Sequence, residues 1–284
     1  MMNTLSPELT QNFSISLSRE ELYIVMRLIR ARRIPGFDLT WLNLTPEGLP
    51  TEETRMALEA ATNALVARGY LGEGHAAKDD QLALSLPSPV VALVGTCAFG
   101  EYSIALPVRT SGEPRLLYLH ELQGLGVIHS MPIPGIHRFE AVEGREGILH
   151  VLDTVLALDA QIAGIALPDG HVTAVALQAA RDAAFTGNID DAVQLLVKGG
   201  LPLATARELG SAMKNPESIG AIIIASREVT GEQQEGALAV VVTAAYCFQL
   251  TNEGTSSQVF RVRSVSAIEL RQWVLACLPL AGQK

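Results

Sequence analysis

Residues 102–142 read YSIALPVRTSGEPRLLYLHELQGLGVIHSMPIPGIHRFEAV, and this stretch predicts an antiparallel sheet. Its apolar residues gather in four runs, at about 102–110, 115–120, 126–131 and 136–142. Short turns rich in Gly, Ser and Pro separate the runs. Because short connections favour hairpins between neighbouring strands, we expect a meander. A further strand is expected just before it, at 89–99.

Helical patterns flank this meander on both sides. A helix is predicted over 18–33, because Ser18 and Glu21 form a capping box ahead of an apolar stripe with helical spacing. A second is predicted over 51–68, with Thr51 as its cap and Gly69 at its end. A third, at 145–158, closes this half of the chain.

The second half shows a similar series of elements. Helices are predicted over 172–185, 188–198 and 203–214, strands over 219–227, 236–250 and 258–265, and a last helix over 266–278. The strand at 236–250 has a two-residue period that places Leu238 and Phe248 on one face. Ser266 and Glu269 form a second capping box.

The two halves resemble each other in sequence. Residues 65–69, LVARG, parallel 196–200, LVKGG, and Pro89 and Pro216 each precede an apolar strand. The alternative is a chance similarity of two α+β halves. We predict an α+β fold whose two pseudo-symmetric halves contribute to a mostly antiparallel central sheet flanked by helical subdomains. The expected halves are 1–158 and 159–284.

Composition bears on the class of partner. The chain has 284 residues, of which 48% are hydrophobic, and a net charge of −9. An acidic chain opposes general nucleic-acid binding, which depends on phosphate contacts by Lys and Arg. The segment ALVARGYL, at 64–71, resembles the turn of a winged helix, so a DNA-associated regulator is an alternative. No basic recognition helix accompanies it.

Location and redox environment follow from three features. Residues 82–100 form the longest uncharged run, but Pro87 and Pro89 interrupt it, so we expect no membrane insertion. The opening residues, Met1 to Gln11, are polar and carry no secretory signal. The three cysteines are far apart and form no CxxC. These features predict a cytoplasmic protein with reduced cysteines.

The search for chemistry finds no motif. The six histidines have neither HExxH nor HxH spacing, and the chain contains no GxSxG, GxGxxG or GxxxxGK[ST]. His150 and Asp153 lie three apart on one predicted helix, where we expect a surface hydrogen bond. We expect no catalytic residue, no cofactor and no metal. The alternative is a small-molecule enzyme or ligand sensor whose site is assembled from distant residues.

The order of elements resembles the EspG family of bacterial type VII secretion chaperones. The resemblance begins at LSREELYIVMRLIRARRIPGF, continues through TEETRMALEAATNALVARGYL and LALSLPSPVVAL, and ends at VFRVRSVSAIELRQWVLACLP. It covers nearly the whole chain as a pattern and an order of segments. The resemblance implies a non-catalytic cytosolic chaperone or adaptor that holds helical partners of the PE–PPE type.

Three apolar residues are the candidates for binding such a partner. Phe248, Leu250 and Phe260 lie on predicted strands of the second half. The alternative is that they pack in the core, as most large apolar side chains do. The sequence alone sets neither the identity of the partner nor the oligomeric state.

Overall fold

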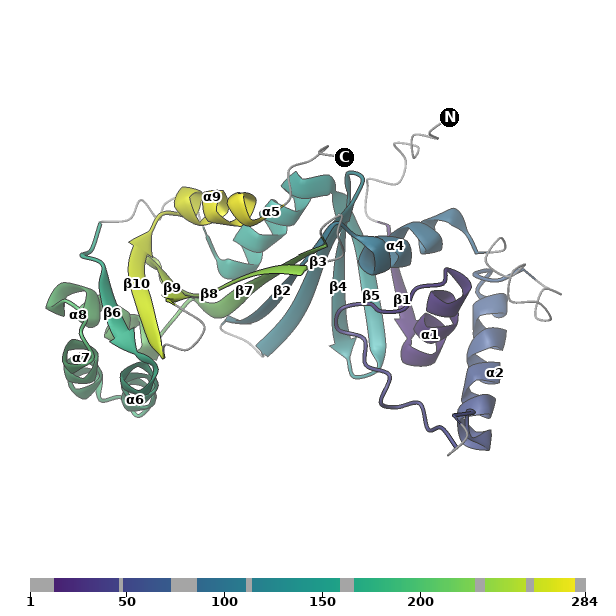
Figure 1. Ribbon diagram of the computed structural model, residues 1–284, viewed down its shortest axis with the longest axis horizontal. Coiled ribbons are helices and arrows are strands. Elements are labelled where there is room, and N and C mark those ends of the chain that lie inside the picture. Colours follow the sequence, from purple (N-terminus) through teal and green to yellow (C-terminus); the bar gives the residue numbers. More distant parts are fainter. Residues whose placement is uncertain are drawn as a thin grey trace. The chain divides into compact units, whose positions relative to one another are not determined.

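The computed structural model contains one large antiparallel sheet, which confirms the predicted α+β class (Figure 1). It describes residues 13–45, 48–72, 86–110, 114–158, 166–227, 233–253 and 258–278. Within them the strand order is β1-β5-β4-β3-β2-β7-β8-β9-β10-β6. The strands are β1 (Ser14–Ser18), β2 (Tyr102–Thr110), β3 (Pro114–Leu122), β4 (Leu125–Ile133), β5 (Ile136–Glu143), β6 (Gly170–Thr173), β7 (Ser218–Arg227), β8 (Gln233–Val242), β9 (Cys247–Asn252) and β10 (Val259–Val265).

The strand order shows the internal repeat. The first five strands run β1-β5-β4-β3-β2 inward from one edge, and the last five run β6-β10-β9-β8-β7 inward from the other. In each half, a short strand leads into helices, then four strands, then a closing helix. The short strands β1 and β6 are additions to the prediction, because four or five residues give little periodicity to read.

Contacts divide the chain into two units, which differ from the two sequence halves. Unit 1 is Met1–Ser103 with Leu117–Ile148, and unit 2 is Ile104–Leu116 with Leu149–Lys284. The division into halves at residue 158 concerns sequence repetition and stays a prediction.

Unit 1 carries helices α1 (Arg19–Leu28), α2 (Glu52–Ala67) and α4 (Ser88–Phe99). The capping box of Ser18 and Glu21 is confirmed, as is the cap at Thr51. Buried residues of α1 and α4 pack with Phe139 and Val127 of the sheet in one apolar cluster. Gly69 adopts a left-handed φ of 70° just after α2, as expected for a residue that ends a helix.

The predicted strand at 89–99 is wrong, because this segment forms α4. Pro89 lies in the first turn of the helix, where a missing N–H costs little. Its residues are apolar all round, and seven of them are buried. A helix buried on all sides has no polar face, so its sequence lacks helical periodicity. The repeat therefore pairs Pro87 with Pro202, each the N-cap of a helix, and not Pro89 with Pro216.

The other helices are α5 (Gly144–Leu156), α6 (Ala174–Phe185), α7 (Ile189–Lys198), α8 (Leu203–Lys214) and α9 (Ala267–Cys277). Each was predicted to within a few residues. In unit 2, α6, α7 and α8 pack with Val172, Phe248 and Val262 of the strands in a second apolar cluster. The capping box of Ser266 and Glu269 is confirmed at the start of α9.

The long strand predicted at 236–250 is wrong, because a turn divides it into β8 and β9. The N–H of Thr243 donates to the carbonyl of Tyr246, and the Thr243 hydroxyl accepts from the N–H groups of Ala245 and Tyr246. A hydroxyl that satisfies turn amides in this way stabilises a reversal of the chain. The turn moves Phe248 from the face of Leu238 to the face of Val241, its cross-strand partner.

Candidate partner-binding surface

Three neighbouring strands of unit 2 have one well-covered face. Residues at alternate positions of β2, β7 and β8 are buried, among them Ile104, Leu106 and Ile222. This face lies against α5 and α9: the Ser218 hydroxyl donates to the Leu156 carbonyl at 2.6 Å, and Gly236 lies near Cys277. Figure 1 shows both helices on the same side of these strands.

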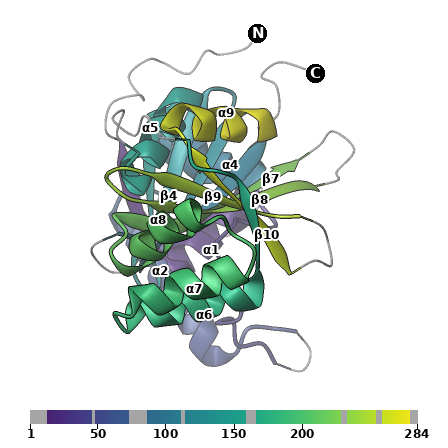
Figure 2. The ribbon, with the colours of Figure 1, turned by 90° about the vertical axis from the view of Figure 1, so that its left-hand side faces the viewer.

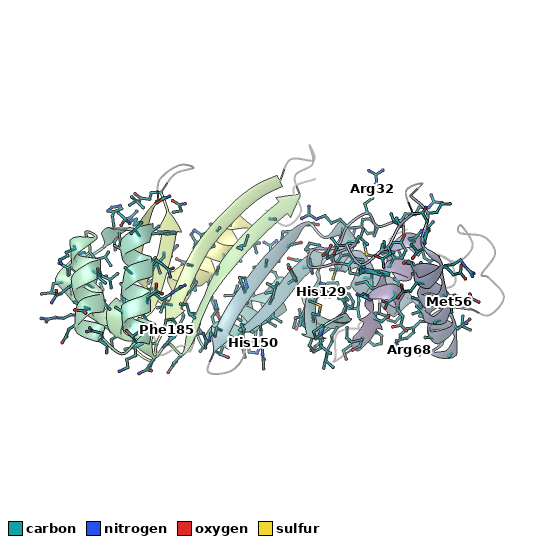
Figure 3. All side chains as sticks on the ribbon, turned by 90° about the horizontal axis from the view of Figure 1, so that it is seen from below. Arg32, Met56, Arg68, His129, His150 and Phe185 are labelled. Carbon is teal, nitrogen blue, oxygen red and sulfur yellow. The ribbon has the colours of Figure 1, made fainter. Side chains whose placement is uncertain are left out.

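The opposite face of these strands is open and apolar. In Figure 3, none of the described helices lies in front of β7 and β8 on this side. We call it the bare face. It carries Ala105, Pro107 and Arg109 of β2, Ile219, Ala221 and Ile223 of β7, and Ala237 and Ala239 of β8. Ile219 and Ala239 form its border, where they pack against the apolar cluster of unit 2. These side chains are half-buried or exposed, and Ile223 is 40% exposed.

The composition of the bare face is unusual for a solvated sheet. An antiparallel sheet with one packed face normally alternates apolar residues inward with polar residues outward. Here the outward positions hold Ala, Pro and Ile, and Arg109 is the charged residue among the eight. An exposed apolar patch of this kind typically marks an interaction site. The bare face is therefore our candidate for partner binding.

The residues predicted from the sequence to bind a partner are Phe248, Leu250 and Phe260. They lie beside the bare face, beneath helices α6 to α8. Ala239 of the bare face lies opposite Leu250 of β9. Leu250 and Phe248 are buried in the cluster formed with α6, α7 and α8, and Phe260 packs half-buried against it. Their burial fits the alternative that these residues pack in the core. A role for them in partner binding stays a prediction. Sequence reasoning missed the bare face because it requires knowing which side the helices cover.

The helices α6 to α8 add exposed apolar side chains to unit 2. Val175 and Phe185 of α6 are 71% and 60% exposed, and Leu203 of α8 is 51% exposed. Phe185 is marked in Figure 3 at the end of its helix. Single exposed apolar residues are common on protein surfaces. These residues therefore serve best as controls for the bare face.

Unit 1 contains a groove of about 500 Å³ between α1, α2 and β1. Its lining includes Ala57, Ala61 and Ala64 of α2, with Glu21 and Arg68 at the polar side. Arg68 Nη1 lies 2.9 Å from both carboxylate oxygens of Glu21. The lining holds no histidine, cysteine or tyrosine, so this groove gives no support to a catalytic site assembled from distant residues.

A buried polar contact in unit 1 has a structural role. The Tyr102 hydroxyl donates to Glu121 Oε2 at 2.5 Å, and Arg145 Nε lies 3.3 Å from the same oxygen. Burial and this carboxylate raise the pKa of Tyr102 far above its usual value. The phenol is therefore neutral, and the arrangement holds α5 against β3 without an exposed reactive group.

The predicted hydrogen bond between His150 and Asp153 is wrong. Both carboxylate oxygens of Asp153 accept from Arg271 of α9 instead, with Nε at 2.9 Å. An arginine fork binds a carboxylate through two bonds, which a single histidine cannot offer. His150 is exposed.

The cysteines are free thiols. Burial raises the pKa of Cys247 to about 12 and that of Cys97 well above its ordinary value. A thiol that stays protonated is a poor nucleophile, so neither residue offers covalent chemistry.

Strand pairing brings together three histidines of unit 1 that come from three successive strands. His120 of β3, His129 of β4 and His137 of β5 have ring centroids 6.3 and 5.2 Å apart in succession. His129 Nε2 and His137 Nδ1 share a hydrogen bond of 2.9 Å. Within the described part of the chain, no three His, Cys, Asp or Glu side chains are grouped to hold a metal ion.

Among the residues that the structure describes, no helix has both the length and the apolar character needed to cross a membrane. Searches of known protein families and of curated proteins returned no match for this sequence. The similarity of this chain to a known protein lies in its three-dimensional structure.

The fold is similar to that of a solved type VII secretion chaperone. The solved structure of EspG5 from Mycobacterium tuberculosis, in complex with a PE25–PPE41 dimer, matches with a TM-score of 0.60 and 12% sequence identity. The match covers 94% of this chain and 98% of that chain. The resemblance drawn from the sequence therefore holds at the level of fold.

Proposed function

We propose that this protein is a non-catalytic, cytosolic chaperone or adaptor that binds a helical protein partner of the PE–PPE type. The observation that carries the proposal is the bare face, where apolar residues occupy positions that solvent-facing strands normally give to polar side chains. The similar structure, EspG5, was solved with a PE25–PPE41 dimer bound. Its fold supports the class of partner proposed here.

The side chains of the bare face suit a helical partner. Ala221, Ala237 and Ala239 are short, so the backbone of a partner helix can approach the sheet closely. Ile223 is the large exposed side chain among them and serves as an anchor. Arg109 supplies a positive charge at the edge of the patch, which favours a partner with an acidic residue at that point.

Replacing Ile223 with Asp tests the proposal. An aspartate buried against an apolar partner loses its hydration without gaining a cation, so we expect the affinity to fall at least about tenfold. The measurement is isothermal titration calorimetry with a PE–PPE pair from the native host, supported by co-purification after co-expression.

The matched control is Ile268→Asp. Ile268 lies on α9 and is 68% exposed, so this variant adds the same charge to the same unit away from the bare face. We expect it to bind like the unmodified chain. Equal affinity for both variants, each folded by circular dichroism, would remove the bare face from the proposal. Failure of the unmodified chain to bind any such pair would contradict the proposed partner class.

A further inference from the structure

We call His120, His129 and His137 the histidine row. The row lies on the side of the sheet that faces the main apolar cluster of unit 1. His129 pairs with Phe139 across the strands, and their rings stack at 4.7 Å. Tyr118 of β3 stacks on His129 at 5.6 Å. All three histidines are buried. Three imidazoles thus occupy positions where apolar side chains would be expected.

The segment Ile34 to Phe37, which follows α1, covers this row. Ile34 is buried in the unit 1 cluster, and the ring of Phe37 meets that of His137 edge-on at 5.3 Å. Gly36 has a φ of 81°, and a Cβ placed there would lie 2.2 Å from the Tyr118 ring. Only glycine allows the backbone to approach so closely. The segment is therefore fitted against the row.

The row has few partners for an added proton. The Ser103 hydroxyl lies 3.0 Å from His120 Nδ1, and His120 Nε2 has no hydrogen-bond partner, whereas the Pro35 carbonyl of the covering segment is the acceptor beside His129. Burial lowers the pKa of His120 to about 3 and of His137 to about 4, and it lowers the pKa of His129 well below 6.5. The neighbouring rings lower the pKa of His129 further, whereas the Pro35 carbonyl raises it.

Among the described residues, the elements packed on this side offer no counter-charge. Tyr118 is the titratable group in contact with the rings, and α4 contributes the thiol of Cys97. In α1 the buried carboxylate is that of Glu21, and it is paired with Arg68. The flanking Arg33 and Asp38 have exposed side chains. None of the three histidines forms an ion pair with a carboxylate in the described ranges.

We propose that the three stacked histidines act as an acid-sensitive latch, which holds the segment Ile34 to Phe37 on the sheet while neutral and releases it when protonated. Two adjacent imidazolium rings repel each other, and a buried imidazolium with an unpartnered N–H, as at His120 Nε2, draws water into the core. The chain can relieve both costs by lifting the covering segment. Unit 2 has no such row among its described residues, since His150 and His171 are exposed.

Two tryptophans, one in each unit, allow a direct test. Trp41 follows the covering segment and meets Tyr23 of α1 edge-on, whereas Trp273 lies on α9 of unit 2. The chain contains no other tryptophan. The fluorescence of Trp41 is read in the variant Trp273→Phe, and that of Trp273 in Trp41→Phe. On titration to acid we expect the Trp41 transition at a pH about one unit higher than the Trp273 transition.

The variant His129→Phe, made in the Trp273→Phe background, identifies the source of this difference. Phenylalanine can keep the stack with Phe139 while it removes the central titrating ring, so the Trp41 transition should move down toward that of Trp273. The matched control, His171→Gln, should leave it unchanged. Coincident transitions of the two tryptophans, or an unchanged Trp41 transition in His129→Phe, would overturn the latch.

A measurement on the unmodified chain is independent of how that variant folds. Proton NMR follows the ring signals of the histidines as the pH is lowered. The signals of the three row histidines should stay those of neutral rings until the Trp41 transition begins. Titration of the row near pH 6.5, with Trp41 unchanged, would also overturn the proposal.

Discussion

Lowering the pH from about 7 to about 5 is expected to remove at least about 4 kcal/mol from the free energy of unfolding. Folding lowers the pKa of His120 to about 3 and of His137 to about 4. Between those values and 6.5, the unfolded chain binds protons that the folded chain excludes, so falling pH favours unfolding. Each of these two rings contributes about 2 kcal/mol at pH 5. His129 acts in the same direction.

Urea unfolding at the two pH values, followed by far-ultraviolet circular dichroism, measures this loss. The stability provided by the neutral rings is fully present above pH 6.5 and declines as the pH falls from 6.5 toward the lower pKa values of the folded chain. The control is His150→Gln, which removes an exposed histidine outside the row and should show the same loss as the unmodified chain. Equal stability at pH 7 and pH 5 would mean that the row is hydrated or paired in solution.

The sequence predicted the local elements well because their signals are local. The caps at Ser18, Thr51 and Ser266 each lie within three residues of the groups they satisfy. The strand prediction for the α4 segment was wrong because a helix buried on all sides loses its periodicity. The turn at Thr243 was not predicted because its signal in the sequence is one hydroxyl in an apolar run.

The features that suggest function depend on strand pairing, which the sequence does not reveal. His120, His129 and His137 have no motif spacing, and they meet only because β3, β4 and β5 pair in a given register. The bare face likewise depends on which side of β7 the helices α5 and α9 cover. Periodicity showed that these strands have two faces. It could not show which face remains open to a partner.

Truncating Phe248 to Ala is expected to lower the free energy of unfolding by about 3–5 kcal/mol. Its side chain is fully buried in the unit 2 cluster, faces Val241 across the strands and stacks with Tyr246 at 5.7 Å. Removing the ring forfeits these contacts and leaves a cavity that close-packed neighbours fill only in part. Phe248→Leu retains most of the volume and should cost less than about 1.5 kcal/mol.

The control for this substitution is Phe185→Ala, in the same unit. Phe185 is 60% exposed at the end of α6, so its truncation should change the stability by less than about 0.5 kcal/mol. Thermal and urea unfolding of the three variants gives the comparison, and calorimetry with the PE–PPE pair gives their affinities. If Phe248 acts through packing, Phe248→Leu will bind like the unmodified chain. If instead Phe248→Ala is as stable as the unmodified chain and loses the partner, the ring belongs to the binding surface, which must then open beneath α6 to α8 to expose it.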